Sequence, residues 1–280
     1  MKVLWISDFS IKHNKGGAQR SDDIIIRKGL ELGHDITHFT HDSDLNLLTE
    51  PYDNIISANL EHISRLFPAV VGWLSSQNNH SRLEHDKNAY LNPNERRLLF
   101  GNCKNTFFLS EYHYSVFKRS YGDFFVNVKI IQDPIDTSLF YNRKNPREDK
   151  ILGIGFMHYL KGTETLFDCV FKNPDKKFVI AGWGSKMYEH LAKSSPNVEF
   201  LGLVDYEKMP DLLNRYQTLF YHPIVEEPFC RSVAEAILCG VKVSINENIG
   251  CAHELNRVGL DKFSQNCNSA QNQFWDTLVL

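Results

Sequence analysis

Two carboxylates stand on either side of a stretch that is typical of a helix start. Glu227 and Glu235 are separated by seven residues, the first of which is Pro228. Proline is tolerated in the first turn of a helix, and Gly240 follows the last apolar-periodic residue as a glycine at a helix C-terminus would. At about 3.6 residues per turn, Glu235 should lie about two turns inside the helix. Such an arrangement could hold a sugar hydroxyl, a diphosphate and a ribose in that order.

The mouth of this predicted helix is a candidate anion site, because the first N–H groups of a helix have no partner within it. These N–H groups belong to Phe229, Cys230, Arg231 and Ser232. The guanidinium of Arg231 could also grip a diphosphate in bidentate fashion. The alternative interpretation is that both glutamates are solvated charges on a helix surface and that Arg231 is an exposed helix residue.

The elements around this stretch alternate between strand and helix along the whole chain, which is typical of parallel sheets in α/β proteins. In the first half the sequence predicts strands over 3–7, 35–39, 52–57, 69–74, 106–110 and 128–131, and helices over 18–32, 60–67, from 93 onward, and over 111–121. In the second half it predicts strands over 151–156, 177–184, 197–202, 217–223 and 241–245, and helices over 163–171, 209–216 and, as a short last element, 270–280.

A length of 280 residues suits two domains of ordinary size. The stretch 142–150 is polar and lacks periodicity, so it predicts a linker. We therefore expect an α/β protein with two Rossmann-like lobes whose parallel sheets face a cleft. The N-terminal lobe should cover 1–143 and the C-terminal lobe 144–280.

Composition argues against several classes of protein. The net charge is −3 and no basic block is present, which argues against a nucleic-acid partner. No apolar run approaches the roughly 20 residues of a membrane span, although peripheral contact with a membrane stays open. The N-terminus reads as a first strand and not as a signal peptide. The six scattered cysteines form no C-x-x-C pair, so we expect neither structural zinc nor disulfides, and a cytoplasmic protein.

With these elements in place, Glu227, seven intervening residues and then Glu235-Ala-Ile-Leu-Cys-Gly resemble the E-x7-E motif of retaining nucleotide-sugar glycosyltransferases of family 4. That family has the two-lobed GT-B fold. The resemblance implies that Glu227 contacts hydroxyls of the donor sugar, that Glu235 contacts the ribose, and that the amides between them contact the diphosphate.

Further stretches of the second half resemble the family's motifs in the family's order. They are Gly155 followed by Lys161-Gly162, then Gly182-Trp-Gly184, then Asn197-Val-Glu-Phe-Leu-Gly-Leu-Val, and finally Gly250-Cys-Ala-His-Glu254. Asp133-Pro-Ile-Asp resembles the element that leads from the first lobe to the second, with Asp133-Pro134 in place of Asn-Gly. The resemblance covers 133–254, and the first lobe matches only in outline.

The resemblance also implies the roles of residues in catalysis. Lys161 and the helix N–H groups would stabilise the departing diphosphate, and Glu227 would orient the sugar. A first-lobe histidine near the sugar and diphosphate corresponds in position to His85, with His80 and His113 as rivals. The Gly16-Gly17 pair, at the first strand-to-helix turn, would let the backbone approach the diphosphate or the acceptor.

The expected reaction is transfer from a nucleotide sugar, such as a UDP- or GDP-sugar, to a glycan, lipid-linked or small-molecule acceptor. It should proceed on the front face with retention, without a covalent intermediate, a cofactor or a metal ion. Two departures bear on activity: Phe156 stands where the family has an arginine, and the chain ends soon after Glu254, without the family's long terminal helix.

Three alternatives stay open. A nucleotide-binding module that no longer catalyses transfer would explain Phe156. A metal-dependent glycosyltransferase of the single-sheet fold is suggested by Asp42-Ser-Asp44, although this pattern is also common turn chemistry. A nicotinamide oxidoreductase is disfavoured, because Gly182-Trp-Gly-Ser-Lys-Met lacks the third glycine of a dinucleotide-binding turn.

Overall fold

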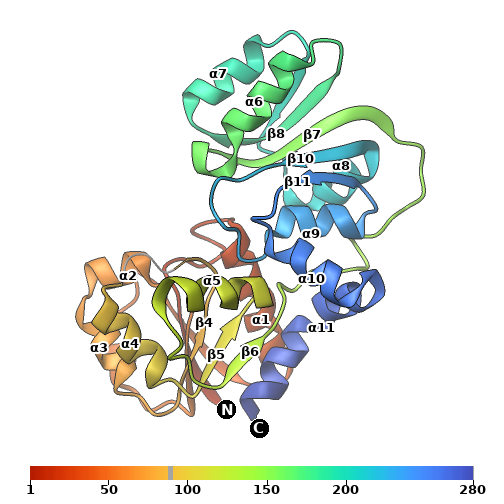
Figure 1. The fold of residues 1–280 in the computed structure, drawn as a ribbon. Helices are drawn as coiled ribbons and strands as arrows, with labels where there is room; N and C mark the ends of the chain where they lie inside the picture. Colours follow the sequence, from red (N-terminus) through yellow and green to blue (C-terminus); the bar gives the residue numbers. More distant parts are fainter. Residues whose placement is uncertain (88–90, 280) are drawn as a thin grey trace. The chain divides into compact units, whose positions relative to one another are not determined.

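The computed structural model describes residues 1–87 and 91–279 and divides the chain into two compact units (Figure 1). The first unit comprises Met1–Pro134 together with the segment from Asn266 onward, and the second comprises Ile135–Gln265. Each unit contains one sheet, and its neighbouring strands pair in parallel. The predicted α/β fold with two parallel sheets is confirmed.

The sheet of the first unit has six strands in the order β2-β1-β3-β4-β5-β6. They are β1 (Lys2–Ile6), β2 (Asp35–Phe39), β3 (Asn54–Ser57), β4 (His80–Leu83), β5 (Asn105–Phe108) and β6 (Val128–Ile130). Strands β3, β4 and β5 are buried at every residue. Such burial is expected for parallel strands that are covered on both faces.

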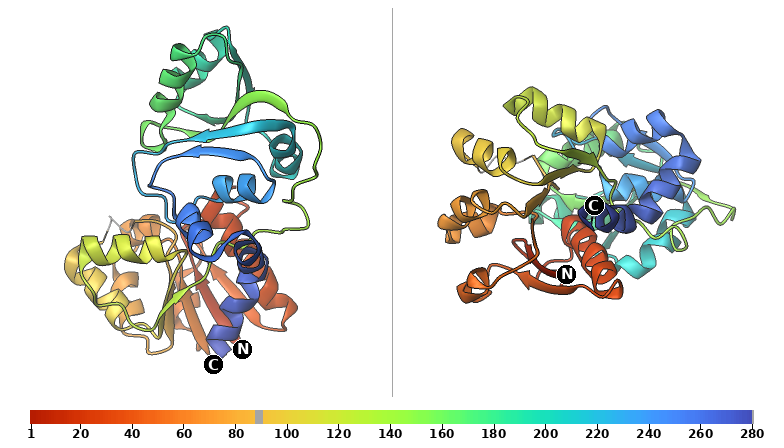
Figure 2. Two further views of the ribbon diagram at one scale, coloured as in Figure 1. Left: turned by 45° about the vertical axis from the view of Figure 1, so that its right-hand side comes forward. Right: turned by 90° about the horizontal axis from the view of Figure 1, so that it is seen from below.

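Helices cover both faces of this sheet (Figure 2). They are α1 (Gly17–Glu31), α2 (Glu61–Leu66), α3 (Ala69–Ser75), α4 (Pro93–Gly101), α5 (Glu111–Tyr121) and the C-terminal part of α11 (Leu260–Val279), with a short 3-10 turn, η1 (Leu45–Thr49). Helices α1 and α11 share one face, and α2 to α5 lie on the other. The indole N–H of Trp275 donates to the carbonyl of Ile25 at 2.8 Å. The ring of Phe274 packs against those of Trp5 and Phe107, at centroid distances of 5.6 and 4.7 Å.

The sheet of the second unit has five strands in the order β11-β10-β7-β8-β9. They are β7 (Glu148–Met157), β8 (Phe178–Gly184), β9 (Val198–Gly202), β10 (Tyr216–Tyr221) and β11 (Lys242–Ile245). Its helices are α6 (Thr163–Lys172), α7 (Lys186–Ser194), α8 (Met209–Arg215), α9 (Arg231–Leu238) and α10 (Gly250–Val258), with 3-10 turns η2 (Tyr159–Lys161) and η3 (Tyr206–Lys208). Helices α6 and α7 cover one face of the sheet, while α8 and α9 cover the other (Figure 1).

Residues 69–75 form helix α3, so the strand expected there was wrong. The valines and the tryptophan of this run favoured a strand, but Val70, Val71 and Leu74 are the buried residues, at the spacing of one helix face. The fourth strand is β4, in a stretch for which the sequence predicted neither a strand nor a helix. Its polar side chains are buried with partners: His80 Nε2 lies 2.7 Å from Ser57 Oγ.

Helix α11 has 20 residues, so the expectations of a short last helix and of no long terminal helix were wrong. Its sequence is rich in asparagine, glutamine and serine, which hides the pattern. The buried residues nevertheless recur at helical spacing. They are Phe263, Cys267, Ala270, Phe274, Trp275 and Leu278.

The division between the units also differs from the expected boundary between 143 and 144. It lies between Pro134 and Ile135, and the residues from Asn266 onward return to the first unit. Residues that precede the expected boundary already pack in the second unit: the ring of Phe140 lies 5.4 Å from that of Tyr206. The polar stretch 142–150 is anchored there too, because Arg143 pairs with Asp211 at 2.5 Å. Helices α7 and α10 were not predicted.

Candidate active site

The stretch between the two glutamates leaves β10 and enters α9. The helix begins at Arg231, so Pro228 precedes it. The expectation that Pro228 would stand in the first turn of the helix was therefore wrong. Cys230 is the N-cap and has φ 73° and ψ 81°, a left-handed conformation. This conformation costs of order 1–3 kcal/mol in a residue other than glycine and is concentrated at functional sites. At the other end, Gly240 has φ 74°, as predicted for a glycine at the helix C-terminus.

Glu227 is held at a fixed place beside this helix start. Its N–H donates to the carbonyl of Asn248 at 2.8 Å, and its carbonyl accepts from the N–H of Gly250 at 2.9 Å. Its carboxylate Oε1 accepts from Lys161 Nζ at 2.6 Å and from the Tyr221 hydroxyl at 3.1 Å. The side chain of Glu227 is 10% exposed, whereas that of Lys161 is 37% exposed. The pair thus joins an anchored carboxylate to a cation that solvent can reach.

Glu235 belongs to a second buried group, which sequence reasoning did not foresee. Its Oε1 accepts from the Tyr206 hydroxyl at 2.9 Å and lies 3.5 Å from Nη2 of Arg231. The same Nη2 donates to the Tyr206 hydroxyl at 3.2 Å. Glu235 and Arg231 are 4% and 9% exposed. The interpretation of these residues as solvated helix-surface charges is therefore wrong.

Two tyrosines position these carboxylates as proton donors. Burial, and then the charge of Glu235, raise the pKa of Tyr206. Burial, followed by the neighbouring Cys230 and Glu227, raises the pKa of Tyr221 as well. Both hydroxyls therefore keep their protons at neutral pH. No motif in the sequence marks either tyrosine, since each reaches its glutamate through the tertiary fold.

Cys230 lies between the two carboxylate groups in sequence, but its thiol is not activated. Burial, and then the charge of Glu227, raise the pKa of Cys230. A thiol that keeps its proton is a poor nucleophile. The conformation of its backbone, and not its sulfur chemistry, therefore distinguishes this residue.

The predicted glycines of the second unit stand where two strands approach closely. Gly155 of β7 and Gly182 of β8 are register partners. A Cβ atom on Gly182 would lie 2.0 Å from the carbonyl oxygen of Gly155, and one on Gly184 would lie 2.4 Å from that of Met157. Neither position leaves room for a side chain.

Phe156, which stands where the resemblance would place an arginine, is 46% exposed. Its ring lies 5.9 Å from that of Trp183 in an edge-on arrangement and stacks with that of His158, also at 5.9 Å. An apolar group therefore stands at this end of β7, beside the turn η2 that carries Lys161.

In the first unit, Gly16 is the N-cap of α1 and Gly17 is its first residue, as the predicted strand-to-helix turn requires. His85 follows β4, and its Nε2 lies 2.8 Å from Asp22 Oδ1 of α1. Burial disfavours the charged form of His85, but the negative charge and hydrogen bond of Asp22 raise its pKa to about 9. His85 is therefore a cation at neutral pH.

The rivals of His85 are core residues of a different kind. His80 is fully buried and His113 is 1% exposed. Burial lowers the pKa of each to about 3, so both stay neutral. Among the three histidines considered from the sequence, His85 is the one that carries a charge.

The Asp42-Ser-Asp44 pattern forms a local turn. Asp44 is the N-cap of η1, and its side chain accepts from the N–H of Asn46 at 2.9 Å. Asp42 Oδ1 accepts from Thr40 Oγ1 at 2.5 Å. These contacts agree with the interpretation of this pattern as turn chemistry.

Comparison with known proteins points to one family for the second half of the chain. Residues 135–273 match the family model described as "Glycosyl transferases group 1". The search of curated proteins returned no match. In residues 1–87 and 91–279, no helix has both the length and the apolar character that crossing a membrane requires.

Solved structures share the whole fold. Anabaena Alr3699/HepE, in complex with UDP-glucose, aligns with a TM-score of 0.66 at 16% identity and covers 98% of this chain and 95% of its own. Sucrose-phosphate synthase from Thermosynechococcus elongatus aligns with a TM-score of 0.69 at 14% identity, with coverage of 99% and 96%. AviGT4, a glycosyltransferase of avilamycin A biosynthesis, aligns with a TM-score of 0.62 at 17% identity, with coverage of 97% and 88%. At these identities the likeness establishes the fold, which is that of GT-B glycosyltransferases.

Proposed function

The chain is a glycosyltransferase with a group 1 domain over residues 135–273, and from this premise we propose its reaction. The protein transfers a sugar from a nucleoside-diphosphate sugar with retention of the anomeric configuration. The observation that carries this proposal is the Lys161–Glu227 pair, held at 2.6 Å beside the start of α9. It places a cation and an oriented carboxylate next to backbone N–H groups. UDP is the first nucleotide to test, since the HepE structure holds UDP-glucose.

In this proposal the departing diphosphate meets positive charge from Lys161 and from the start of α9. Preorganised cations and N–H groups stabilise charge that develops on a leaving group. Lys161 is exposed enough to turn from Glu227 to a ligand, while Glu227 is held by its backbone and by Tyr221. Glu227 is then free to accept from a hydroxyl of the donor sugar and to orient the ring.

Glu235 is proposed to accept a hydrogen bond from the ribose, and Arg231 to share the diphosphate charge with Lys161. Both side chains are already positioned by the Tyr206 hydroxyl. Positioning before a ligand binds reduces the entropy that binding costs. The N–H groups of Phe229, Cys230, Arg231 and Ser232, and the glycines Gly155, Gly182 and Gly184, complete the proposed donor site.

The first unit is proposed to contribute His85 and the Gly16-Gly17 turn. The charge that Asp22 maintains on His85 suits contact with a donor phosphate or sugar oxygen. A pocket in the same unit has Ser10, Lys12, Gln19, Asp23 and Thr40 in its lining. Polar groups of this kind suit an acceptor rich in hydroxyls, whether glycan, lipid-linked or small molecule.

The proposed transfer needs neither a metal ion nor another cofactor. Lys161, Arg231 and the N–H groups at α9 supply the positive charge that a divalent ion provides in D-x-D enzymes. Retention would proceed on the front face of the sugar, because Glu227, the carboxylate beside the start of α9, is assigned to a hydroxyl of the donor sugar and no separate nucleophile is proposed.

The second candidate is a module that binds a nucleotide sugar without transferring it. The observation that favours it is Phe156, a half-exposed aromatic ring where the family has a cation. Binding and turnover separate the two candidates, because an inactive module keeps the first and lacks the second.

The test combines a thermal-shift screen with a transfer assay. A nucleoside diphosphate at 100 times its Kd should stabilise the protein by about 2.7 kcal/mol. Glu235→Ala should weaken binding of UDP and of uridine, since the ribose contact is common to both. Glu227→Ala should preserve UDP binding and abolish transfer and donor hydrolysis. Variants that bind and turn over like the parent would overturn the assignment, and binding without turnover in the parent would establish the inactive module.

A further inference from the structure

A group of side chains in the first unit has the composition of a metal site. His13, His41 and Asp42 each offer one ligand atom, and these atoms lie within 4.8 Å of one another. We propose that this group binds a divalent transition-metal ion, with Zn²⁺ as the preferred ion. The proposal does not rest on sugar transfer. Its residues lie outside the donor site, although His13 also lines the pocket proposed for the acceptor.

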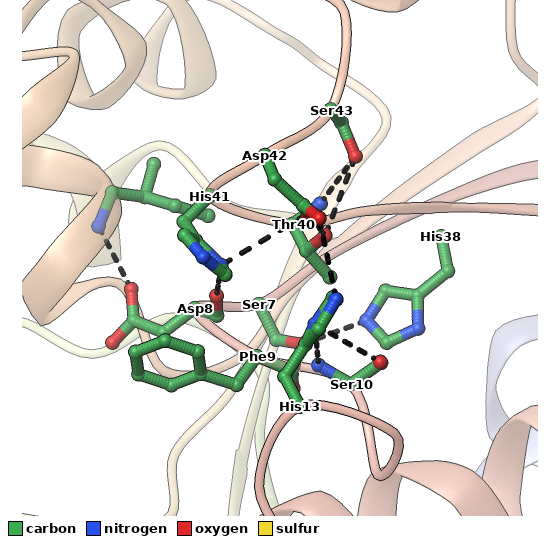
Figure 3. A network of polar contacts seen from close by, with 11 residues as sticks. Ser7, Asp8, Phe9, Ser10, His13, His38, Thr40, His41, Asp42 and Ser43 are labelled. Atoms are coloured by element: carbon green, nitrogen blue, oxygen red, sulfur yellow. Dashed lines mark hydrogen bonds and ion pairs between the residues drawn. The ribbon is translucent and has the colours of Figure 1, made fainter.

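Two loops bring these residues together at the carboxyl ends of adjacent strands (Figure 3). His13 lies in the loop between β1 and α1, whereas His41 and Asp42 lie in the loop after β2, which ends at Phe39. Strands β1 and β2 pair in parallel over their full length, so the segments that leave them emerge side by side. The rings of His13 and His41 meet edge-on, at a centroid distance of 5.2 Å.

The distances are close to those that a metal ion needs. His13 Nε2 lies 3.3 Å from Asp42 Oδ2, and His41 Nδ1 lies 4.0 Å from Asp42 Oδ1. Zinc binds nitrogen and oxygen at about 2.0–2.2 Å in tetrahedral geometry, which sets neighbouring ligand atoms about 3.4 Å apart. The first distance already meets this value. The second distance runs to the other carboxylate oxygen, and since the ligand atoms lie within 4.8 Å of one another, binding requires His41 and Asp42 to approach by up to about 1.4 Å. Asp42 is 55% exposed at its side chain, so it has room for that movement.

Outer contacts hold the ligands in place. Asp42 Oδ1 accepts from Thr40, and His13 Nδ1 lies 3.1 Å from Ser10 Oγ, so each residue turns its other polar atom to the group. Contacts of this kind orient metal ligands in known sites. His41 Nδ1 lies 3.1 Å from the carbonyl of Asp8. A metal ion bound at His41 Nδ1 would displace the proton that this nitrogen donates to the Asp8 carbonyl, because the ligating nitrogen of a histidine must be deprotonated.

The ligand chemistry selects the ion. Two imidazoles and one carboxylate suit Zn²⁺ and its transition-metal neighbours, whereas Mg²⁺ and Ca²⁺ prefer oxygen ligands. Three protein ligands leave a fourth position for water. The ion would tie the loop of His13 to the loop after β2 and so fix the segment that leads into Gly16 and Gly17.

The experiment measures Zn²⁺ binding to metal-free protein by isothermal titration calorimetry. One equivalent should bind, and His13→Gln, His41→Gln and Asp42→Asn should each weaken binding at least tenfold. The matched control is Asp44→Asn, the same change two residues away in the same turn. Asn is as good an N-cap as Asp, so this variant should fold and bind Zn²⁺ like the parent. Affinity should also fall on acidification, because protons compete for the ligands.

Cobalt substitution separates this site from the cysteines, two of which, Cys169 and Cys230, are partly exposed. Co²⁺ at the proposed site should give tetrahedral d–d absorption without thiolate charge-transfer bands. Three outcomes would overturn the proposal: the absence of saturable binding, thiolate bands, or equal affinity in the parent and both histidine variants. Loss of binding in both aspartate variants with the histidine variants unchanged would also overturn it, in favour of a D-x-D site.

Discussion

At the scale of single residues, the candidate donor site has few cationic side chains that could bind a diphosphate. Lys161 is the partly exposed cation, and Phe156 stands where the resemblance would place a second cation. Arg231 is already engaged with Tyr206 and lies close to Glu235. The charge on Lys161 should therefore carry a large share of diphosphate affinity.

Replacing Lys161 tests that share. Loss of one charge-assisted hydrogen bond costs about 1.5–3 kcal/mol, so Lys161→Ala should weaken UDP binding by roughly ten- to a hundredfold and uridine binding much less. Phe156→Arg should tighten UDP binding by restoring the second cation. The control is Lys172→Ala, an exposed lysine of α6 in the same unit. Calorimetric Kd values that change equally for UDP and uridine would contradict the assignment.

Buried histidines should make the stability of the first unit fall both above and below about pH 6.5. The pKa of His85 is raised from 6.5 to about 9, so the folded state keeps a proton that the unfolded state loses, and stability falls as pH rises from 6.5 to 9. The pKa values of His80 and His113 are lowered from 6.5 to about 3, so stability also falls as pH drops below 6.5. Chemical denaturation should show a maximum near pH 6.5. Asp22→Asn should flatten the alkaline side, and an unchanged alkaline slope in this variant would contradict the ion pair.

The sequence predicted the residues that belong to a motif and missed those that act through the fold. Glu227 and Glu235 could be found because they flank a predicted helix start, and Lys161 because its stretch resembles a family motif. Tyr206 and Tyr221 could not, because a tyrosine hydroxyl that reaches a glutamate 29 or six residues away leaves no periodic trace. The roles of all of these residues toward a ligand stay predictions.

At the scale of elements, the pairing of β7 with β8 explains Gly182 and Gly184 without reference to any ligand. The backbone of Gly155 occupies the space where a side chain on Gly182 would stand. These glycines are therefore needed for the sheet itself, beside any role in approaching a phosphate.

Gly182→Ala should destabilise the second unit. A Cβ atom 2.0 Å from a backbone oxygen forces the strands apart, and overpacking of this kind costs about 1–3 kcal/mol or more. Gly72→Ala is the control, because a Cβ atom there meets open space and α3 gains a better helix former. Urea titration should show a lower midpoint for the first variant only. A normal midpoint for Gly182→Ala would contradict the close approach.

Element prediction failed where tertiary packing overrode local composition. The apolar run at 69–75 has strand-forming residues but places Val70, Val71 and Leu74 on one helix face. The start of α11 is polar on its outer side, so its apolar stripe of Phe263, Cys267 and Phe274 was overlooked. Helix α5, which ends before Gly122, was located correctly.

At the scale of the whole molecule, the first unit is built from two segments that are far apart in sequence. Its sheet was predicted from the alternation of strand and helix. The return of the last helix was not, because nothing in a local pattern shows which distant surface a helix covers. Trp275 is the residue that joins the segments, with a ring that nearly fills the space above Gly29.

Trp275→Ala should destabilise the first unit by about 3–5 kcal/mol, the usual cost of removing a large buried side chain. Hydrogen exchange in β1 and α1 should speed up, while β7 and β8 keep the protection of the parent. Val279→Ala, a change at an exposed position of the same helix, serves as the control. Equal protection of β1 in parent and Trp275→Ala would contradict the packing of α11.

The two-segment construction of the first unit has a consequence for protein synthesis. Residues 1–134 leave the ribosome first, yet Trp5, Ile25 and Phe107 contact Phe274 and Trp275, which emerge only after the second unit. At about 5–20 residues per second, translation of the second unit takes of the order of ten seconds. During that interval the nascent first unit exposes the apolar face that α11 later covers. Chaperone binding to the nascent chain should be strongest during this interval. The second unit is a continuous segment, so it can complete its fold before the first unit does.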